Sequence, residues 1–175
     1  VGLLDGAQLG LVCRLQRMAH LVACLGHQRA QFGIGGWDVL VQAQIGKLPA
    51  EGLCAEGDFG YASGRAAAEH LLSLADPVTA IIASSDQMAA ATLDMALERG
   101  LRVPQDLSVI SFDNTPKALF SQPPLTAIDQ PIAATAARAA ELLIAAKRGE
   151  MLPTTPTIVP AELIVRGSTG PAPVR

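Results

Sequence analysis

The stretch TAIIASSDQMAAATLDMALERG, from Thr79 to Gly100, constrains the fold of this chain more than any other. Its first five residues are apolar or β-branched, and this run is too short for a helix but long enough for a buried strand. From Met88 the apolar residues follow helical spacing, and Gly100 supplies a left-handed stop after them. The stretch therefore predicts one strand–turn–helix unit of the kind that repeats in parallel α/β sheets.

Further apolar runs repeat this alternation along the chain. The pattern predicts helices over 17–25, 63–74 and 132–148, strands over 107–112 and 125–129, and a strand pair over 157–166 that Pro160 divides. Strands that alternate with helices of this length are typical of a doubly wound α/β sheet. Because the helix over 132–148 is apolar nearly all round, we expect it to be deeply packed.

Two of the predicted strands end in polar turns that carry an acid. The strand over 79–83 runs into Ser85 and Asp86, and the strand over 107–112 runs into Asp113. In open parallel sheets ligands lie outside the carboxyl ends of the strands, so both turns are candidates for one binding site. A purely structural role remains open for both acids. Asp86 can cap the following helix, and its position favours this role over ligand contact. Asp113 can simply form the turn that follows its strand.

Composition and charge exclude several classes of protein. Half of the 175 residues are apolar and only 17% are charged, so the chain has enough apolar surface for a core and is not a disordered segment. The net charge is −3 and Lys and Arg form no cluster, so the chain by itself is a poor candidate for nucleic-acid binding. It has no run of 18 apolar residues and no basic-then-apolar opening segment, so neither a membrane span nor a secretion signal is predicted.

The residues that most often carry chemistry form no recognisable site. Three widely spaced cysteines without a CxxC pair favour a reducing cytoplasm over a disulfide framework; they are Cys13, Cys24 and Cys54. The histidines lack the spacing of zinc ligands. The segment GYASG places its serine one position too late for the nucleophile elbow of a hydrolase. The segment GIGGWD lacks the third glycine of a dinucleotide-binding fingerprint. We therefore expect no metal, no cofactor and no catalytic triad.

Five segments follow one another in a characteristic order. They are HLVACLGHQR (20–29), EGDF (56–59), the block over 79–114, PPLTAIDQP (123–131) and VPAELIVRGST (159–169). Together they resemble the effector-binding core of lactose-repressor-type (LacI/GalR) transcriptional regulators. The resemblance implies a type I periplasmic-binding-protein-like fold of two doubly wound parallel-sheet lobes, with the first lobe incomplete.

The resemblance also implies how the chain divides into lobes. Residues 1–33 and 129–160 would form the partial N-terminal lobe, residues 34–128 and 161–170 the C-terminal lobe, and residues 171–175 a tail. The DNA-binding headpiece of the family has no counterpart in this sequence.

The same resemblance implies which residues contact a small effector between the lobes. Asp113 matches the acid that hydrogen-bonds ligand hydroxyls or ring nitrogens, and Phe59 stands at the aromatic position that stacks on a sugar or purine face. Ser85 stands where many members have an asparagine, so a weaker or water-bridged contact is expected. Asp5 resembles a ligand-contacting acid of the first lobe, and Gln130 lies at a crossing near the cleft. A hydroxyl-rich ring requires this combination of stacking and directional hydrogen bonds.

This sequence departs from the family pattern on both sides of HLVACLGHQR, since the segment LVCRLQRMA before it is about two helical turns longer than the pattern, and some positions keep a second interpretation. The segment between Arg29 and Glu56 is shorter than the pattern, and the family's ligand-gripping Arg-x-x-Gly has no match there. Phe59 is equally compatible with a core aromatic. The contacts proposed for Ser85 and Asp5 are likewise balanced against purely structural roles.

Four apolar residues are candidates for a dimer interface. Met88 and Met95 belong either to the core or to an interface, where the resemblance places the outer face of their helix. Leu119 and Phe120, in the loop KALFSQPP, would join them, because exposed apolar loop residues often mark contacts. A homodimer is therefore predicted.

The sequence as a whole predicts the ligand-sensing core of a cytoplasmic transcriptional regulator. A sugar or purine-like effector would bias lobe closure, and an attached headpiece would convert closure into binding of operator DNA. The alternative is a solute-binding protein for sugar uptake, which should carry a secretion signal and which the VRGST ending argues against. A sugar-acting enzyme on the same scaffold is the weakest hypothesis, because no nucleophile–base pair can be named.

Overall fold

The computed structural model describes residues 22–25, 53–155 and 157–171 of the chain, and in the first of these ranges only the main chain. One six-stranded sheet organises the described part, with strand order β2-β1-β3-β4-β5-β6. The first five strands of this order pair in parallel, and β6 is antiparallel to β5. An α/β architecture with a mostly parallel sheet is therefore confirmed.

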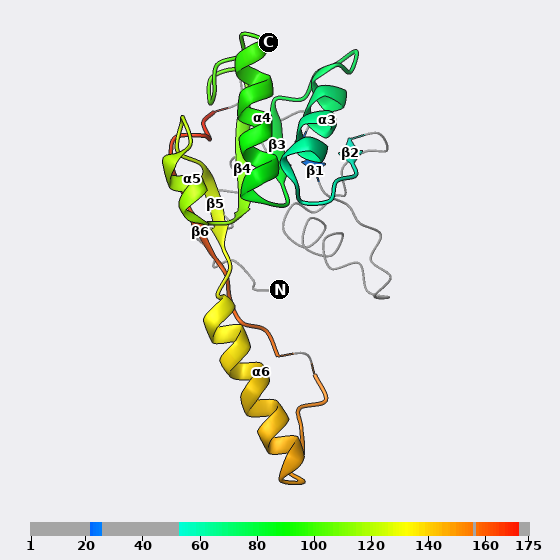
Figure 1. Ribbon diagram of the computed structural model, residues 1–175, viewed down its shortest axis with the longest axis vertical. Coiled ribbons are helices and arrows are strands. Elements are labelled where there is room, and N and C mark those ends of the chain that lie inside the picture. Colours follow the sequence, from blue (N-terminus) through cyan, green and yellow to red (C-terminus); the bar gives the residue numbers. More distant parts are fainter. Residues whose placement is uncertain (1–21, 26–52, 156, 172–175) are drawn as a thin grey trace.

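The elements follow the alternation predicted from the sequence (Figure 1). The strands are β1 (Val22–Leu25), β2 (Cys54–Ala55), β3 (Ala80–Ala83), β4 (Ser108–Asp113), β5 (Thr126–Asp129) and β6 (Glu162–Ile164). The helices are α3 (Tyr61–Leu72), α4 (Asp86–Glu98), α5 (Pro116–Phe120) and α6 (Ile132–Lys147). Helices α4 and α6 are each followed by a glycine in the left-handed conformation, Gly100 with a φ of 70° and Gly149 with a φ of 74°.

The main core lies between the sheet and the helix pair α3 and α4. The buried face of α3 recurs at helical spacing, at Gly64, Ala67, Ala68, Leu71 and Leu72. Helix α4 packs against α3, β3 and β4, so it is buried on several sides. Gly64 allows the closest approach, since a Cβ at this position would stand 2.5 Å from Met88 Cα in the backbone of α4. Small residues in α3 therefore set the distance between the two helices.

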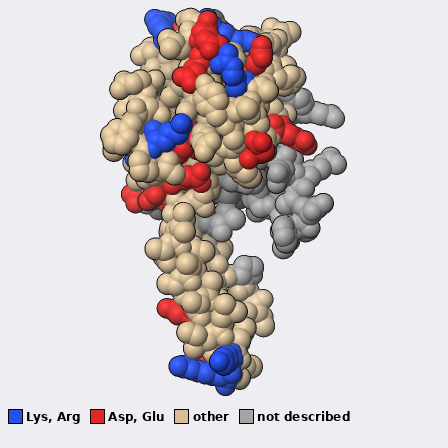
Figure 2. All heavy atoms as spheres, in the orientation of Figure 1, with Lys and Arg blue, Asp and Glu red and all other residues tan. Residues whose placement is uncertain are grey.

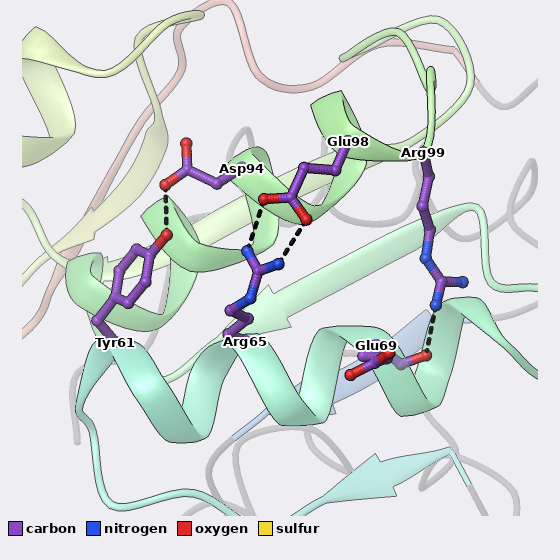
Figure 3. Close-up of polar contacts among 6 residues, drawn as sticks. All are labelled: Tyr61, Arg65, Glu69, Asp94, Glu98 and Arg99. Carbon is purple, nitrogen blue, oxygen red and sulfur yellow. Dashed lines mark hydrogen bonds and ion pairs between the residues drawn. The ribbon is translucent and has the colours of Figure 1, made fainter.

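Polar side chains join α3 to α4 along the outer side of this pair (Figure 3). Tyr61 donates a hydrogen bond of 2.7 Å to Asp94 Oδ2, and both terminal nitrogens of Arg65 donate to the Glu98 carboxylate. Tyr61 and Arg65 are one helical turn apart, as are Asp94 and Glu98. The two contacts therefore lie one above the other along the α3–α4 interface. The hydrogen bond to Asp94 raises the pKa of Tyr61, and the one from Arg65 lowers the pKa of Glu98.

We expect replacement of Arg65 by alanine to leave the melting temperature almost unchanged. Both partners of the Arg65–Glu98 ion pair are exposed, so solvent screens the attraction and ordering two long side chains offsets much of it. Thermal unfolding followed by circular dichroism measures the effect, with Arg138→Ala on α6 as a second exposed ion-pair variant. A fall in melting temperature as large as that caused by truncating a buried side chain would contradict this expectation.

The prediction of a helix over 17–25 is wrong for its last four residues. Val22–Leu25 form strand β1, which pairs in register with Ala80–Ala83 of β3 and also pairs with β2. Short apolar runs are compatible with either structure, and here the open edge of the neighbouring strand decides in favour of β. Since β1 shares a sheet with β3, β4 and β5, the assignment of residues 1–33 to the other lobe does not hold for this strand.

Helix α6 forms where predicted but is not packed as predicted. None of its residues is buried, and Leu143 is 72% exposed despite the apolar composition of the helix. Figure 1 shows α6 extending away from the sheet body, and no other described helix or strand packs along it. The strand pair predicted over 157–166 is also corrected, because only Glu162–Ile164 of that range forms a strand.

Candidate functional site

The carboxyl ends of β3, β4 and β5 meet at one edge of the sheet. Ser85 and Asp86 follow β3, Asp113 ends β4, and Asp129 ends β5 directly opposite Asp113 in the strand register. Parallel strands that begin at one edge all end at the other, which explains why polar turns distant in sequence gather here. The predicted convergence of the two acid-bearing turns is therefore present in the structure.

Ser85 has two structural bonds at this edge. It is the N-cap of α4, with an extended backbone, and its Oγ accepts the Met88 N–H at 3.1 Å. The same hydroxyl donates to the carbonyl oxygen of Phe59 at 2.7 Å. The side chain that caps α4 is thus Ser85 and not Asp86, which corrects the capping interpretation of Asp86 by one residue.

Asp86 instead joins the start of α4 to the start of α5. Its carboxylate is buried, with the residue 2% exposed, and Oδ2 accepts both the N–H of Thr115 at 2.6 Å and its hydroxyl at 2.7 Å. The other oxygen, Oδ1, has no hydrogen-bond partner among the described residues. As the first residue of α4, Asp86 also places negative charge at the positive end of the helix dipole.

Asp113 and Gln130 meet at the point where the chain leaves the sheet towards α6. Gln130 Nε2 donates to Asp113 Oδ1 at 2.6 Å. Partial burial raises the pKa of Asp113 above its ordinary value, and the nearby charge of Asp86 acts in the same direction, while the bond from Gln130 opposes both. Asp113 also has a φ of 109°, a strained conformation of the kind that clusters at functional sites.

Asn114 belongs to this edge and the side chain of Arg166 reaches it, and neither residue is among the predicted site residues. Asn114 has a φ of 57° and donates to Asp129 Oδ1 at 3.1 Å. Arg166 donates to Asn114 Oδ1 at 2.6 Å and to the carbonyl oxygen of Leu125 at 2.7 Å, so it ties β4 to β5. In the sequence, these residues stand out only as the polar pair Asp113-Asn114 after the strand and as the arginine in VRGST. Their contact depends on the fold, which brings Arg166 next to Asn114.

Phe59 lies in a turn that precedes α3 and is 43% exposed, so it is not a core aromatic. Its φ is 68°, and the carbonyl bond from Ser85 places it beside the start of α4. The structure therefore brings four of the five predicted contact residues to one edge, through direct bonds or shared neighbours: Phe59, Ser85, Asp113 and Gln130. Asp5 lies outside the described residues.

The four predicted interface residues divide into two pairs. Met88 and Met95 belong to the core between α4 and its neighbours, so their side chains offer no surface to a second chain and the interface prediction is wrong for them. Leu119 and Phe120 lie on α5 and are exposed, Phe120 by 77%. Only this second pair is available for contact with another protein.

The described residues contain no group of three His, Cys, Asp or Glu side chains arranged to hold a metal ion. Within the same residues, no helix is long and apolar enough to span a bilayer. On the face shown in Figure 2, acidic and basic side chains are interspersed over the sheet body, without a large patch of one sign.

The sequence over residues 41–169 matches the family described as periplasmic binding protein-like domain, and the chain belongs to this family. Among curated proteins, 119 residues are 41% identical to the HTH-type transcriptional repressor CytR of Escherichia coli K12, covering 68% of this chain and 35% of CytR. The chain is thus similar to part of a LacI-type regulator and spans well under two thirds of the length of this relative.

Solved structures extend the same similarity over almost the whole chain. A LacI family transcriptional regulator from Bifidobacterium animalis subsp. lactis is 30% identical with a TM-score of 0.77, covering 97% of this chain and 64% of that one. The transcriptional regulator CelR in complex with cellobiose is 29% identical with a TM-score of 0.74, covering 96% of this chain and 54% of that one. Within its family, the chain corresponds to the effector-binding core of LacI-type regulators, and these relatives are regulators, not enzymes.

Proposed function

We propose that this chain senses a small polar effector, a sugar or a purine-like ring, for a transcriptional regulator. The observation that carries the proposal is that the hydrogen-bonded pair Asp113 and Gln130 lies at the same carboxyl edge of the sheet as Phe59, whose carbonyl oxygen accepts a hydrogen bond from Ser85. An exposed aromatic ring supplies an apolar face for stacking, and the carboxylate and the amide supply directional acceptors and donors. The cellobiose bound to the similar regulator CelR supports a sugar as the first class to test.

Gln130 offers a route from effector binding to movement. It lies between β5 and α6, so the bond from Gln130 to Asp113 ties the crossing segment to the sheet. An effector that takes a hydrogen bond from Gln130, or donates one to Asp113, competes with this tie and biases the position of the crossing segment. In the proposed arrangement α6 belongs to a second lobe, and closure of the lobes is transmitted to a DNA-binding headpiece outside this chain.

Two further parts of the proposal concern partners. The exposed pair Leu119 and Phe120 is proposed to contribute to a homodimer, since exposed apolar residues on a short surface helix favour contact with another protein. Operator DNA is proposed to bind only through the headpiece, which agrees with the mixed charges in Figure 2 and the net charge of −3. The proposed location is the cytoplasm.

A thermal-shift screen with cellobiose, maltose, ribose, adenosine and guanine tests the effector proposal. A ligand at 100 times its Kd adds about 2.7 kcal/mol to the free energy of unfolding. For a chain of this size such a gain raises the melting temperature by roughly 5–10 °C. If no sugar or purine in a wide panel shifts the melting temperature, the sensing proposal fails.

Asp113→Asn is expected to weaken the response to the hit from that screen by about tenfold in affinity, because a charged acceptor is replaced by a neutral one. Asp94→Asn, at the far end of α4, is the matched control and should respond like the unchanged protein. The response should also weaken as pH falls through the raised pKa of Asp113, sooner than for an ordinary aspartate. An unchanged response in Asp113→Asn would remove this residue from the site.

The stability of Asp113→Asn should move in the opposite direction from its function. Because the folded-state pKa of Asp113 is raised, the stability it contributes is present at low pH and is lost as pH rises through that pKa. At neutral pH the neutral variant is therefore expected to melt no lower than the unchanged protein. A clear fall in the melting temperature of Asp113→Asn would contradict the conclusion that burial raises the pKa of Asp113.

A further inference from the structure

The backbone of Phe59 requires a specific restraint. Its φ of 68° lies in the left-handed region, where a side chain with a bulky Cβ substituent is a genuine outlier. Such a conformation persists only when surrounding contacts over-determine it. Phe59 is also 43% exposed, so its ring is not enclosed in the core.

The peptide unit between Phe59 and Gly60 is held at both of its ends. The N–H of Gly60 donates to Asp58 Oδ1 at 2.9 Å, and the carbonyl oxygen of Phe59 accepts from Ser85 Oγ at 2.7 Å. Asp58 is fixed in turn by Ser63, whose hydroxyl donates to Oδ1 and accepts the N–H of Asp58 at 3.1 Å. The Asp58 end is a local turn, and the Ser85 end is the bond that attaches this turn to the start of α4.

Ser85 has no donor left for a ligand. A serine hydroxyl carries one O–H donor and two acceptor positions. The donor is used by the carbonyl oxygen of Phe59, one acceptor position by the N–H of Met88, and the residue is 5% exposed. A direct contact between this hydroxyl and an effector would have to break one of these bonds.

We propose that Ser85 is a positioning residue, which acts on the effector only by holding Phe59 in its left-handed conformation at the edge of the sheet. The part of this inference that concerns the effector rests on the proposed function, and the part that concerns Phe59 does not. The proposal replaces the direct contact that the family resemblance implies for Ser85. Selection among ring-shaped effectors then depends on the Phe59 face and the Asp113 carboxylate.

The restraint is tested first without a ligand, by nuclear magnetic resonance. The one-bond Cα–Hα coupling of Phe59 distinguishes positive from negative φ, and the shifts of the first turn of α4 report on the cap. Ser85→Gly removes the hydroxyl but keeps a residue that is tolerated at an N-cap, and Ser85→Thr keeps the hydroxyl. Ser111→Ala is the matched control, because Ser111 is buried and its hydroxyl has no partner among the described residues.

The expected result is that Ser85→Gly alone loses the positive-φ coupling of Phe59, while α4 keeps its helical shifts. Retention of the positive-φ coupling in Ser85→Gly would overturn the proposal. Loss of the coupling together with the first turn of α4 would also overturn it, because the hydroxyl would then act as a cap and nothing more.

A binding arm uses the sugars and purines of the thermal-shift panel. For any compound that stabilises the unchanged protein, Ser85→Gly should weaken affinity about tenfold, as loss of one aromatic contact does, and Ser85→Thr should not. In a Phe59→Ala background, Ser85→Gly should add no further loss. Additive losses would mean that Ser85 touches the ligand directly. If nothing in the panel binds, the proposed function fails while the resonance experiment still decides the role of Ser85.

Discussion

Replacing Gly64 by alanine is expected to lower the stability of the protein by about 2 kcal/mol, although alanine is the better helix former. The added Cβ would stand 2.5 Å from Met88 Cα, so α3 and α4 must move apart. Overpacking of this kind costs up to about 3 kcal/mol, and the gain in helix propensity returns about 1 kcal/mol. Thermal unfolding should show a fall in melting temperature of roughly 4–8 °C.

Gly57→Ala is the matched control, since it adds the same methyl group against the same neighbour. Its Cβ would meet the terminal methyl group of Met88 at 2.3 Å, and this end of a flexible side chain can turn away. Gly57→Ala should therefore cost much less than Gly64→Ala. Adding Met88→Ala should not rescue Gly64→Ala, because the backbone of α4 remains in the way. Equal stability of the two glycine variants would show that the α3–α4 distance is not set by Gly64.

Asp86→Ala is expected to destabilise the protein by about 2–3 kcal/mol. The substitution removes a buried carboxylate oxygen that accepts two hydrogen bonds from Thr115, and bonds to a charged group contribute about 1.5–3 kcal/mol. It also removes negative charge from the positive end of the α4 dipole. Thr115 is itself exposed, so water can partly replace the lost hydrogen bonds, and the loss of stability is smaller than two buried bonds to a charged group would give. Urea unfolding, monitored by the midpoint at constant slope, measures the loss.

Asp86→Asn separates the position of the acceptor from its charge. The asparagine oxygen can still accept both bonds from Thr115, so this variant should lose less than half as much stability as Asp86→Ala. Thr115→Ala should resemble Asp86→Asn, because it keeps the main-chain bond and loses only the hydroxyl. An Asn variant as unstable as the Ala variant would mean that charge at the helix end, and not the link to α5, is the main contribution.

The strand–turn–helix unit at Thr79 shows which features local sequence determines. The predicted strand and helix appear as Ala80–Ala83 and Asp86–Glu98, because a short β-branched run, an N-cap serine and a C-terminal glycine all act within a few residues. The gathering of the two polar turns was also predictable, since the carboxyl ends of parallel strands share an edge. Burial was less predictable: the apolar composition of α6 indicated deep packing, yet none of its residues is buried.

The sequence by itself determined the α/β alternation, the glycine stops after α4 and α6 and the identity of the polar turns, because these depend on backbone preferences of neighbouring residues. The tertiary structure decided that Val22–Leu25 is a strand, that Met88 and Met95 are core, and that Arg166 reaches Asn114. It also decided that the Ser85 hydroxyl donates a hydrogen bond to the carbonyl oxygen of Phe59, 26 positions earlier in the chain. Each of these facts depends on which distant atoms lie within a few ångströms, and only the folded chain sets those distances.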